Sequence, residues 1–305
     1  MNKTIQHVHH LTPAQAGILF HTLDAPGSGQ YVVQIALTLS GEIEPQREQT
    51  AWAALIARHD ALRTAFVWEG QKQPLQVVGV TAKPSVTVED LSADDKASQD
   101  AAIQSYCEAD RTQGFDLRKA PLLRVHRFDL GHGQHHLIIT FHHIVLDGWS
   151  IPLLLRDWIS LYVGRALPPA SNFKDYLGWL HHQDRSAALD FWRAELAGLE
   201  DVPHIPLPAP TTKNTPRGTC SLALPEALTK RLQDFAGSHR LTVSTLVHGL
   251  WALVLARYQD RADVIYGLTR SGRPATLPGA HERVGMFINT LPMHAKIDNS
   301  SQLLD

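Results

Sequence analysis

Hydrophobic and polar positions along the chain alternate with two different periods, which predict strands in some stretches and helices in others. Residues 31–39 are rich in β-branched side chains and predict a strand, whereas Trp52, Leu55 and Ile56 recur after Pro45 at helical spacing. The same criteria predict a helix capped by Thr12, strands at 62–68, 75–78, 122–130, 134–143, 218–224, 263–269 and 284–293, and helices at 97–111, 150–163, 173–180, 187–198, 225–237 and 243–257.

This mixture of elements predicts an α/β protein, and its Pro-rich passages predict two lobes. Residues 167–171, with the sequence LPPAS, are the best linker in the first half, and we place the lobes at 1–170 and 171–305. The length of 305 residues agrees, because about 150 residues per domain correspond to about two domains.

The composition excludes several classes of protein. With 44% hydrophobic and 19% charged residues, the chain is not disordered. A net charge of −2 without any basic block excludes an electrostatic nucleic-acid binder. The start, MNKTIQHVHHLT, lacks the apolar core of a signal peptide, and no run of about 18 apolar residues predicts a membrane span. Two isolated cysteines, Cys107 and Cys220, suit a reducing compartment, so we expect a cytoplasmic protein with no membrane partner.

Histidine is frequent, with 18 copies, and its clusters raise the question of a metal site. The clustered residues are His7, His9 and His10, and His132, His135 and His136. Neither group has carboxylates or cysteines at ligand spacing, so we expect no metal.

The most informative segment is LIITFHHIVLDGWS, residues 137–150. Successive side chains on a strand face opposite ways, so one of His142 and His143 points into packed structure and the other beyond the strand end. A histidine with a pKa near ambient pH can take a proton from an attacking amine or hydroxyl and return it to a leaving group. With the backbone N–H groups of the next loop near a developing oxyanion, the pattern favours acyl transfer.

Asp147 follows the histidine pair by four residues and is expected to hold the loop in place. It can bind a backbone group or pair with an arginine, and Arg58 and Arg63 are both candidates between which the sequence does not choose. A histidine pair alone belongs more often to a surface or a core than to a catalytic site. The Asp147-Gly148 pair at fixed spacing shifts this balance towards function.

The segment HHIVLDGWS resembles the HHxxxDG signature of nonribosomal peptide synthetase condensation domains, which are related in fold to chloramphenicol acetyltransferase. Four further motifs occur in family order over nearly the whole chain. They are LTPAQAGILFH at 11–21, RHDALRTAF at 58–66 with Asp60 where Glu is usual, FKDYLGW at 173–179, and VGMFINTLPMH at 284–294.

The resemblance implies a two-lobed chloramphenicol acetyltransferase-like fold with mixed sheets flanked by helices. It implies that an acceptor amine attacks a donor acyl thioester, with both substrates on phosphopantetheine arms of partner carrier proteins and no bound cofactor. His143 corresponds to the catalytic histidine. His142 and Asp147 take structural positions, Asp147 pairing with an arginine such as Arg63, and Gly148 is where the backbone approaches the substrate. Trp149, Ser150 and Asn289 are candidates for lining the substrate tunnel.

The chain also departs from the family pattern. His294 stands where arginine is usual, and the family continues with further strands and motifs where this chain ends at Asp305, so the second lobe is expected to be incomplete. One alternative is therefore a silent remnant that only binds carrier proteins, and another is a stand-alone acyltransferase that uses coenzyme A thioesters. The loop from Arg270 to Arg273 is expected to be solvated, with contact to a carrier's phosphate as the alternative.

Overall fold

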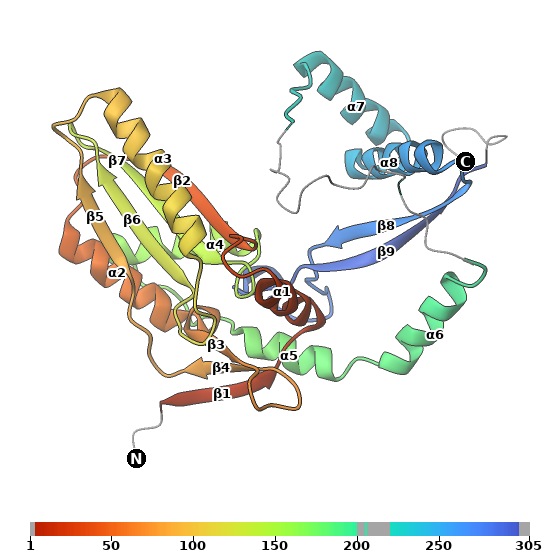
Figure 1. Cartoon of the computed structure of the whole chain (residues 1–305), viewed down its shortest axis with the longest axis horizontal. Coiled ribbons are helices and arrows are strands. Elements are labelled where there is room, and N and C mark those ends of the chain that lie inside the picture. The colour runs from red at the N-terminus through yellow and green to blue at the C-terminus, as the bar shows by residue number, and fades with distance from the viewer. Residues whose placement is uncertain (1–3, 200–204, 206–219, 299–305) are drawn as a thin grey trace. The chain divides into compact units, whose positions relative to one another are not determined.

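A computed structural model describes residues 4–199, 205 and 220–298 (Figure 1). The described chain forms two compact units, the first from residues 1–183 and 269–289 and the second from 184–268 and 290–305. The chain therefore leaves the first unit, forms most of the second and then returns. The lobe boundary predicted at residue 170 differs from this division, because helix α5 (Phe173–His181) and segment 269–289 pack within the first unit.

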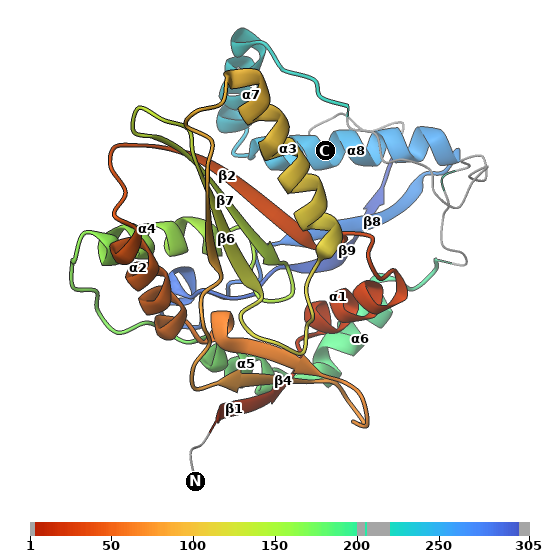
Figure 2. The ribbon, with the colours of Figure 1, turned by 60° about the vertical axis from the view of Figure 1, so that its left-hand side comes forward.

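A four-stranded sheet forms the centre of the first unit (Figure 2). Its order is β2-β7-β6-β5, with bounds Val32–Ser40, Gln134–His142, Leu123–Asp129 and Val86–Asp90. Strand β7 pairs antiparallel with β2 and β6, and β5 runs parallel to β6. The predicted hairpin of 122–130 and 134–143 is confirmed as β6 and β7. Gly131 and Gly133 in its turn have φ of 84° and 68°, values at which a side chain would be strained.

Helices cover both faces of this sheet, as the alternation of side chains in β7 requires. Ile139 and Phe141 face the main core, which they share with residues of α2 (Pro45–Arg58) and α4 (Ser150–Tyr162). Ile138 lies in a second core under α3 (Lys96–Gln113). The side chains of this strand therefore alternate, as predicted, between two hydrophobic cores on opposite faces of the sheet.

A smaller sheet of order β1-β4-β3 lies beside helix α1 (Pro13–Asp24), with strand bounds Ile5–His10, Leu75–Gly79 and Thr64–Val67. Thr12 caps α1 as predicted, and Gln15 completes a capping box. The strands β1 and β5 were not predicted from the sequence. Neither has a buried face, so neither carries the row of buried apolar residues by which a strand is recognised. The predicted strand 62–68 starts later, at Thr64, since 3₁₀ helix η1 (Asp60–Arg63) precedes it.

The part of the second unit that the structure describes contains three helices and a pair of strands. They are α6 (Arg185–Glu195), α7 (Glu226–Ser238), α8 (Val243–Gln259), β8 (Asp263–Arg270) and β9 (Asn289–Lys296). Ala252 and Leu255 of α8 pack against Val264 of β8. Of the strand predicted at 218–224, residues 220–224 have no regular secondary structure and the rest lies outside the described residues.

Among the described residues, no single helix is long and apolar enough to cross a membrane. Helices α7 and α8 together are long and apolar enough, but their axes are bent by 100° at the break between them.

The strand predicted at 284–293 begins only at Asn289. Before it, after the short 3₁₀ helix η2 (Ala280–Glu282), the chain crosses the first unit without a strand partner. The backbone N–H groups of Gly285 and Phe287 bind the side chains of Ser150 and Asp147 instead. Side chains thus replace a neighbouring strand at this point, and they belong to the segment singled out by the sequence.

Candidate active site

The histidine pair lies at the end of β7, where the strand gives way to a buried loop. His142 is the last strand residue, and the His143 backbone N–H donates to the Tyr31 carbonyl over 2.8 Å. The four residues from Ile144 to Asp147 are all at most 2% exposed. Gln15 of α1 donates its side-chain amide to the Ile144 carbonyl at 3.1 Å, a contact that sequence reasoning missed. The loop is thereby held from two sides.

His142 is the histidine that points into packed structure, with 1% of its surface exposed. Its Nδ1 accepts from the Ile144 N–H at 3.2 Å, so the ring proton is on Nε2, which faces Thr22 Oγ1 at 3.4 Å. Burial, together with the neighbouring His143, lowers the pKa of His142 to about 4. The ring is therefore neutral near pH 7 and acts as a fixed part of the packing, which supports its expected structural role.

His143 is only half-buried, and its ring differs from that of its neighbour. Its Nδ1 is buried yet has no hydrogen-bond partner among the described residues. Buried polar atoms are nearly always paired, so an unpaired ring nitrogen points either to a chemical role or to a partner that binds from outside. Of the two histidines, His143 is the one whose ring makes no hydrogen bond among the described residues, so its imidazole is not committed to the packing as that of His142 is.

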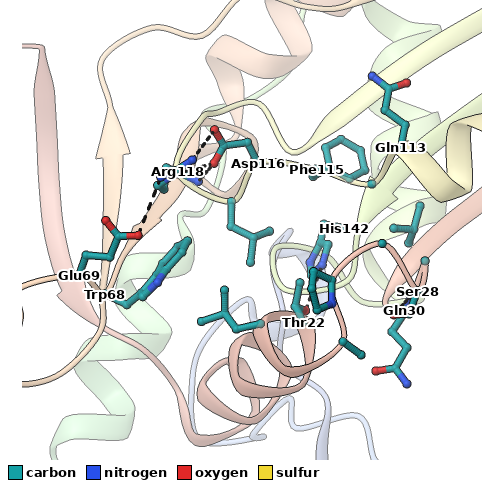
Figure 3. Close-up of a pocket in the computed structure, with 18 residues that line it drawn as sticks. Thr22, Ser28, Gln30, Trp68, Glu69, Gln113, Phe115, Asp116, Arg118 and His142 are labelled. Carbon is teal, nitrogen blue, oxygen red and sulfur yellow. Dashed lines mark hydrogen bonds and ion pairs between the residues drawn. The ribbon is translucent and has the colours of Figure 1, made fainter. Parts of the chain in front are cut away.

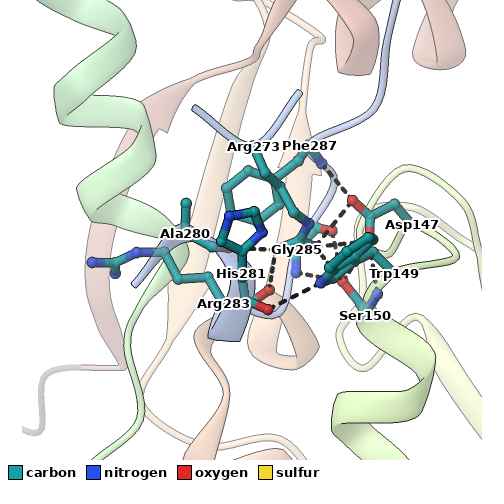
Figure 4. A network of polar contacts seen from close by, with 9 residues as sticks. All are labelled: Asp147, Trp149, Ser150, Arg273, Ala280, His281, Arg283, Gly285 and Phe287. Atoms are coloured by element: carbon teal, nitrogen blue, oxygen red, sulfur yellow. Dashed lines mark hydrogen bonds and ion pairs between the residues drawn. The ribbon is translucent and has the colours of Figure 1, made fainter. Parts of the chain in front are cut away.

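Asp147 is the centre of a buried polar network (Figure 4). Its Oδ1 accepts from the Ser150 N–H at 2.9 Å and the Ser150 hydroxyl at 2.7 Å. Arg273 Nη2 lies 3.0 Å from Oδ1 and 3.1 Å from Oδ2, and Oδ2 also accepts from the Phe287 N–H at 3.2 Å. Both side chains of the ion pair are 0% exposed. The prediction that Asp147 holds the loop through an arginine is confirmed.

The arginine, however, is neither of the two that the sequence suggested. Arg63 instead donates to the backbone carbonyls of Ile56 and Gly79, and Arg58 pairs with Asp157 at 2.8 Å. Arg58 is used by α4 and Arg63 by the end of β4, and no bond joins either guanidinium to Asp147. The pairing with Arg63 was therefore wrong.

Arg273 corrects the expectation of a solvated loop at 270–273 for its own position, whereas Arg270 and Ser271 are exposed as expected. Its Nη1 donates to the carbonyls of Ala280 and Arg283, each at 2.7 Å, and its guanidinium carbon lies 4.1 Å from the centre of the Phe287 ring. Burial lowers the pKa of Arg273, and Asp147 opposes that shift. Both terminal nitrogens of the guanidinium are bound inside the protein and the side chain is 0% exposed, so Arg273 is not the candidate contact for a carrier's phosphate.

The other predicted site residues lie at different depths. Gly148 and Trp149 are exposed, and the Trp149 indole N–H donates to the His281 carbonyl at 3.0 Å (Figure 4). Ser150 is 0% exposed and its hydroxyl is occupied, so the expectation that it lines a tunnel does not hold. Asn289, at the start of β9, stays a prediction.

A cavity of about 540 Å³ lies in the first unit beside the histidine pair (Figure 3). His142 and Phe115 are among its lining residues, as is Arg118, which pairs with Asp116 at 2.9 Å and with Glu69 at 3.9 Å. The Arg118 guanidinium holds the pKa of Asp116 well below its usual range. Three loops that are far apart in the sequence, around residues 25–30, 68–69 and 113–118, line this cavity. No local sequence motif could therefore predict it.

The described residues contain no group of three or more His, Cys, Asp or Glu side chains placed to hold a metal ion. His135, from one of the histidine clusters, shows how such a side chain is used instead. Its two ring nitrogens lie 2.6 Å from Asp129 Oδ1 and 2.9 Å from the Gly41 carbonyl.

Comparison with known proteins places this geometry in a family. A family model described as condensation domain matches residues 5–305. One component of the linear gramicidin synthase of Brevibacillus parabrevis is 40% identical over 97% of this chain, and surfactin synthase subunit 2 of Bacillus subtilis (strain 168) is 34% identical over 99%. The chain spans only 4% and 9% of the lengths of these two proteins.

Two solved structures show the same fold. The condensation domain from the monacolin K polyketide synthase MokA aligns with 96% of this chain and 68% of its own, with a TM-score of 0.79 and 20% identity. The first condensation domain of the calcium-dependent antibiotic synthetase, bound to a substrate analogue, aligns with 98% of this chain and 72% of its own, with a TM-score of 0.76 and 23% identity.

The buried ion pair predicts a large loss of stability when one partner is removed. We expect Arg273→Ala to lower the free energy of unfolding by about 3–5 kcal/mol, because Asp147 keeps a buried charge without its counterion. Arg270→Ala, a change of the same type at an exposed position three residues away, should cost less than about 0.5 kcal/mol. Urea unfolding measures both, and equal losses would contradict the role of the pair.

The low pKa of His142 predicts that stability falls in weak acid. Between the folded pKa of about 4 and the unfolded value of 6.5, only the unfolded state binds the proton. Stability from this residue is thus complete above pH 6.5 and declines as pH falls towards 4, by about 3 kcal/mol in total. His142→Gln should flatten the dependence of unfolding free energy on pH between about pH 4.5 and 7.5. Parallel curves for the two proteins would disprove this.

Proposed function

The chain belongs to the condensation domain family, and from this premise we propose that it forms amide bonds between substrates carried as thioesters in nonribosomal peptide synthesis. The acceptor's amine nitrogen attacks the donor's thioester carbonyl carbon, so that a C–N bond forms and the C–S bond breaks. The nitrogen loses a proton and the departing thiol gains one. The products are an amide and the free thiol of the donor carrier.

The observation that carries the proposal is the state of the two histidines. His143 follows the strand end with an unpaired ring nitrogen, whereas His142 is neutral, buried and hydrogen-bonded. Proton transfer at the attacking amine needs an imidazole that is not already committed to structure. We assign His143 as the catalytic residue on this basis.

The network of Asp147 supports the same assignment. A group that acts on a reacting amine must be held in place, because small displacements from productive geometry are costly in rate. Asp147 fixes the loop through Ser150, Arg273 and Phe287 and does not itself face outward. Its part is to hold the loop.

Partners follow from the chemistry. We propose two carrier proteins, or carrier domains of a synthetase, that present donor and acceptor on phosphopantetheine arms, with no cofactor held by this chain. Linear gramicidin synthase and surfactin synthase, to which the chain is similar, support this setting. Both cysteines are free, which suits a reducing cytoplasm, and we place the reaction there.

His143→Ala is the direct test of the catalytic assignment. We expect it to abolish amide formation between loaded carriers, measured by mass spectrometry of the carrier-bound product, while the melting temperature stays near that of the wild type. His181→Ala, an exposed histidine of α5, is the matched control and should retain activity. Full turnover by the His143 variant would refute the assignment. Rapid turnover of free acyl coenzyme A without any carrier would favour the stand-alone acyltransferase.

Gly148 tests where the substrate lies. A Cβ at this position would meet no protein atom within 4 Å, and the backbone there is not left-handed, so Gly148→Ala should fold normally. If the substrate approaches this backbone, the added methyl group displaces it, and the rate of amide formation should fall by about 10- to 100-fold. Gly178→Ala, also in open space but on α5, should change neither rate nor melting temperature. Wild-type activity of the Gly148 variant would place the substrate elsewhere.

A further inference from the structure

The Ser150 hydroxyl has more polar contacts than a hydroxyl usually makes. It lies 2.7 Å from Asp147 Oδ1, 2.9 Å from the Gly285 carbonyl oxygen, 3.0 Å from the Gly285 nitrogen and 3.3 Å from Arg273 Nη2 (Figure 4). The residue is 0% exposed. The hydroxyl thus contacts both partners of the buried ion pair and both backbone polar groups of one glycine.

A count of protons shows how these contacts can coexist. A hydroxyl has one proton to donate and two lone pairs to accept with. The Gly285 N–H and the Arg273 guanidinium are donors, and they fill the lone pairs. The proton then goes to the Asp147 carboxylate, which is nearer than the Gly285 carbonyl and charged. The Gly285 carbonyl does not depend on that proton, because it also accepts from the Asp147 N–H at 3.2 Å.

The segment that contains Gly285 needs these contacts, since it has no strand partner. The Gly285 backbone also lies so close to α5 that no side chain fits between them, because a Cβ on Gly285 would lie 2.2 Å from a ring carbon of Phe173. Phe173 therefore bounds the segment on one side, and Ser150 with Asp147 holds its backbone on the other. Without the hydroxyl, the Gly285 N–H would be left buried and unpaired.

We propose that Ser150 is a positioning residue for the reaction at His143, which it serves by fastening Gly285 to the loop that begins at His143. The inference rests on the proposed function. Ser150 touches no reacting atom. It acts at the far end of a loop whose intervening residues, Ile144 to Asp147, are fully packed, so a shift at Asp147 is passed along to His143.

The test combines two measurements on Ser150→Ala in the complete protein. Hydrogen exchange of a peptide covering residues 283–287 reports the fastening alone, and we expect it to accelerate about 10- to 100-fold, the effect of one buried polar group left unpaired. A single-turnover assay with loaded carriers, with enzyme in excess, reports the chemistry. We expect its rate constant to fall about 10- to 100-fold while its amplitude stays the same.

The single-turnover assay separates positioning from mere instability. Partial unfolding would lower the concentration of active enzyme, so more protein would be needed for saturation, but the rate constant at saturating enzyme would stay unchanged, whereas lost positioning lowers that rate constant itself. Ser160→Ala is the matched control, because Ser160 is a buried serine of the same helix that lies outside the network, and it should change neither exchange nor rate.

Three results would count against the proposal in distinguishable ways. Unchanged exchange in Ser150→Ala would show that the hydroxyl does not fasten the segment. Faster exchange with an unchanged rate constant would show that the fastening does not position His143. A wild-type protein that forms no amide would overturn the proposed function itself, and with it the role of Ser150, whatever the exchange data show.

Discussion

The buried ion pair between Asp147 and Arg273 is the interaction on which the rest of the site depends. Transfer of two charges from water into a packed interior is costly, and such a pair is tolerated only when its remaining hydrogen-bonding capacity is satisfied. Here the carboxylate also binds Ser150 and Phe287, and the guanidinium also binds two carbonyls, so that among the described residues Arg273 Nε is the one polar side-chain atom of the pair without a partner. Because so many groups must fit at once, the loop after β7 has little freedom to move.

Contacts besides this pair explain why motifs scattered over the chain form one structure. Gln15 of the first motif binds the loop at Ile144, and Asp60 of the second accepts the N–H of Phe173 in the fourth at 3.1 Å. Phe173 in turn packs edge-on against Phe287 of the last motif. Each of these contacts joins residues that are adjacent in space and distant in sequence.

Sequence reasoning succeeded where a pattern is local. The alternation in residues 134–143 gave the strand, the hairpin and the opposite orientations of His142 and His143, because strand period and turn glycines are properties of neighbouring residues. It failed for the partner of Asp147. Any buried arginine can serve, and the choice of Arg273 over Arg63 is made by tertiary packing 126 residues away.

The strand predicted over 284–293 was wrong for residues 284–288, for a related reason. Its apolar residues, such as Met286 and Phe287, are indeed buried, but a core can bury a segment without any strand beside it. The hydroxyl of Ser150 and the carboxylate of Asp147 take the backbone groups that a strand would have paired. The hydrophobic pattern indicates which residues are buried, but it does not indicate which groups form hydrogen bonds with their backbone N–H and C=O groups.

The return of residues 269–289 to the first unit bears on the order in which the protein assembles during synthesis. When residue 183 has left the ribosome, Asp147 is present but its counterion has not yet been made. The first unit cannot close until residues 184–268, which belong to the second unit, have also emerged. The first unit is thus not completed before the second has been synthesised, and the loop after β7 gains its counterion only once Arg273 has been made.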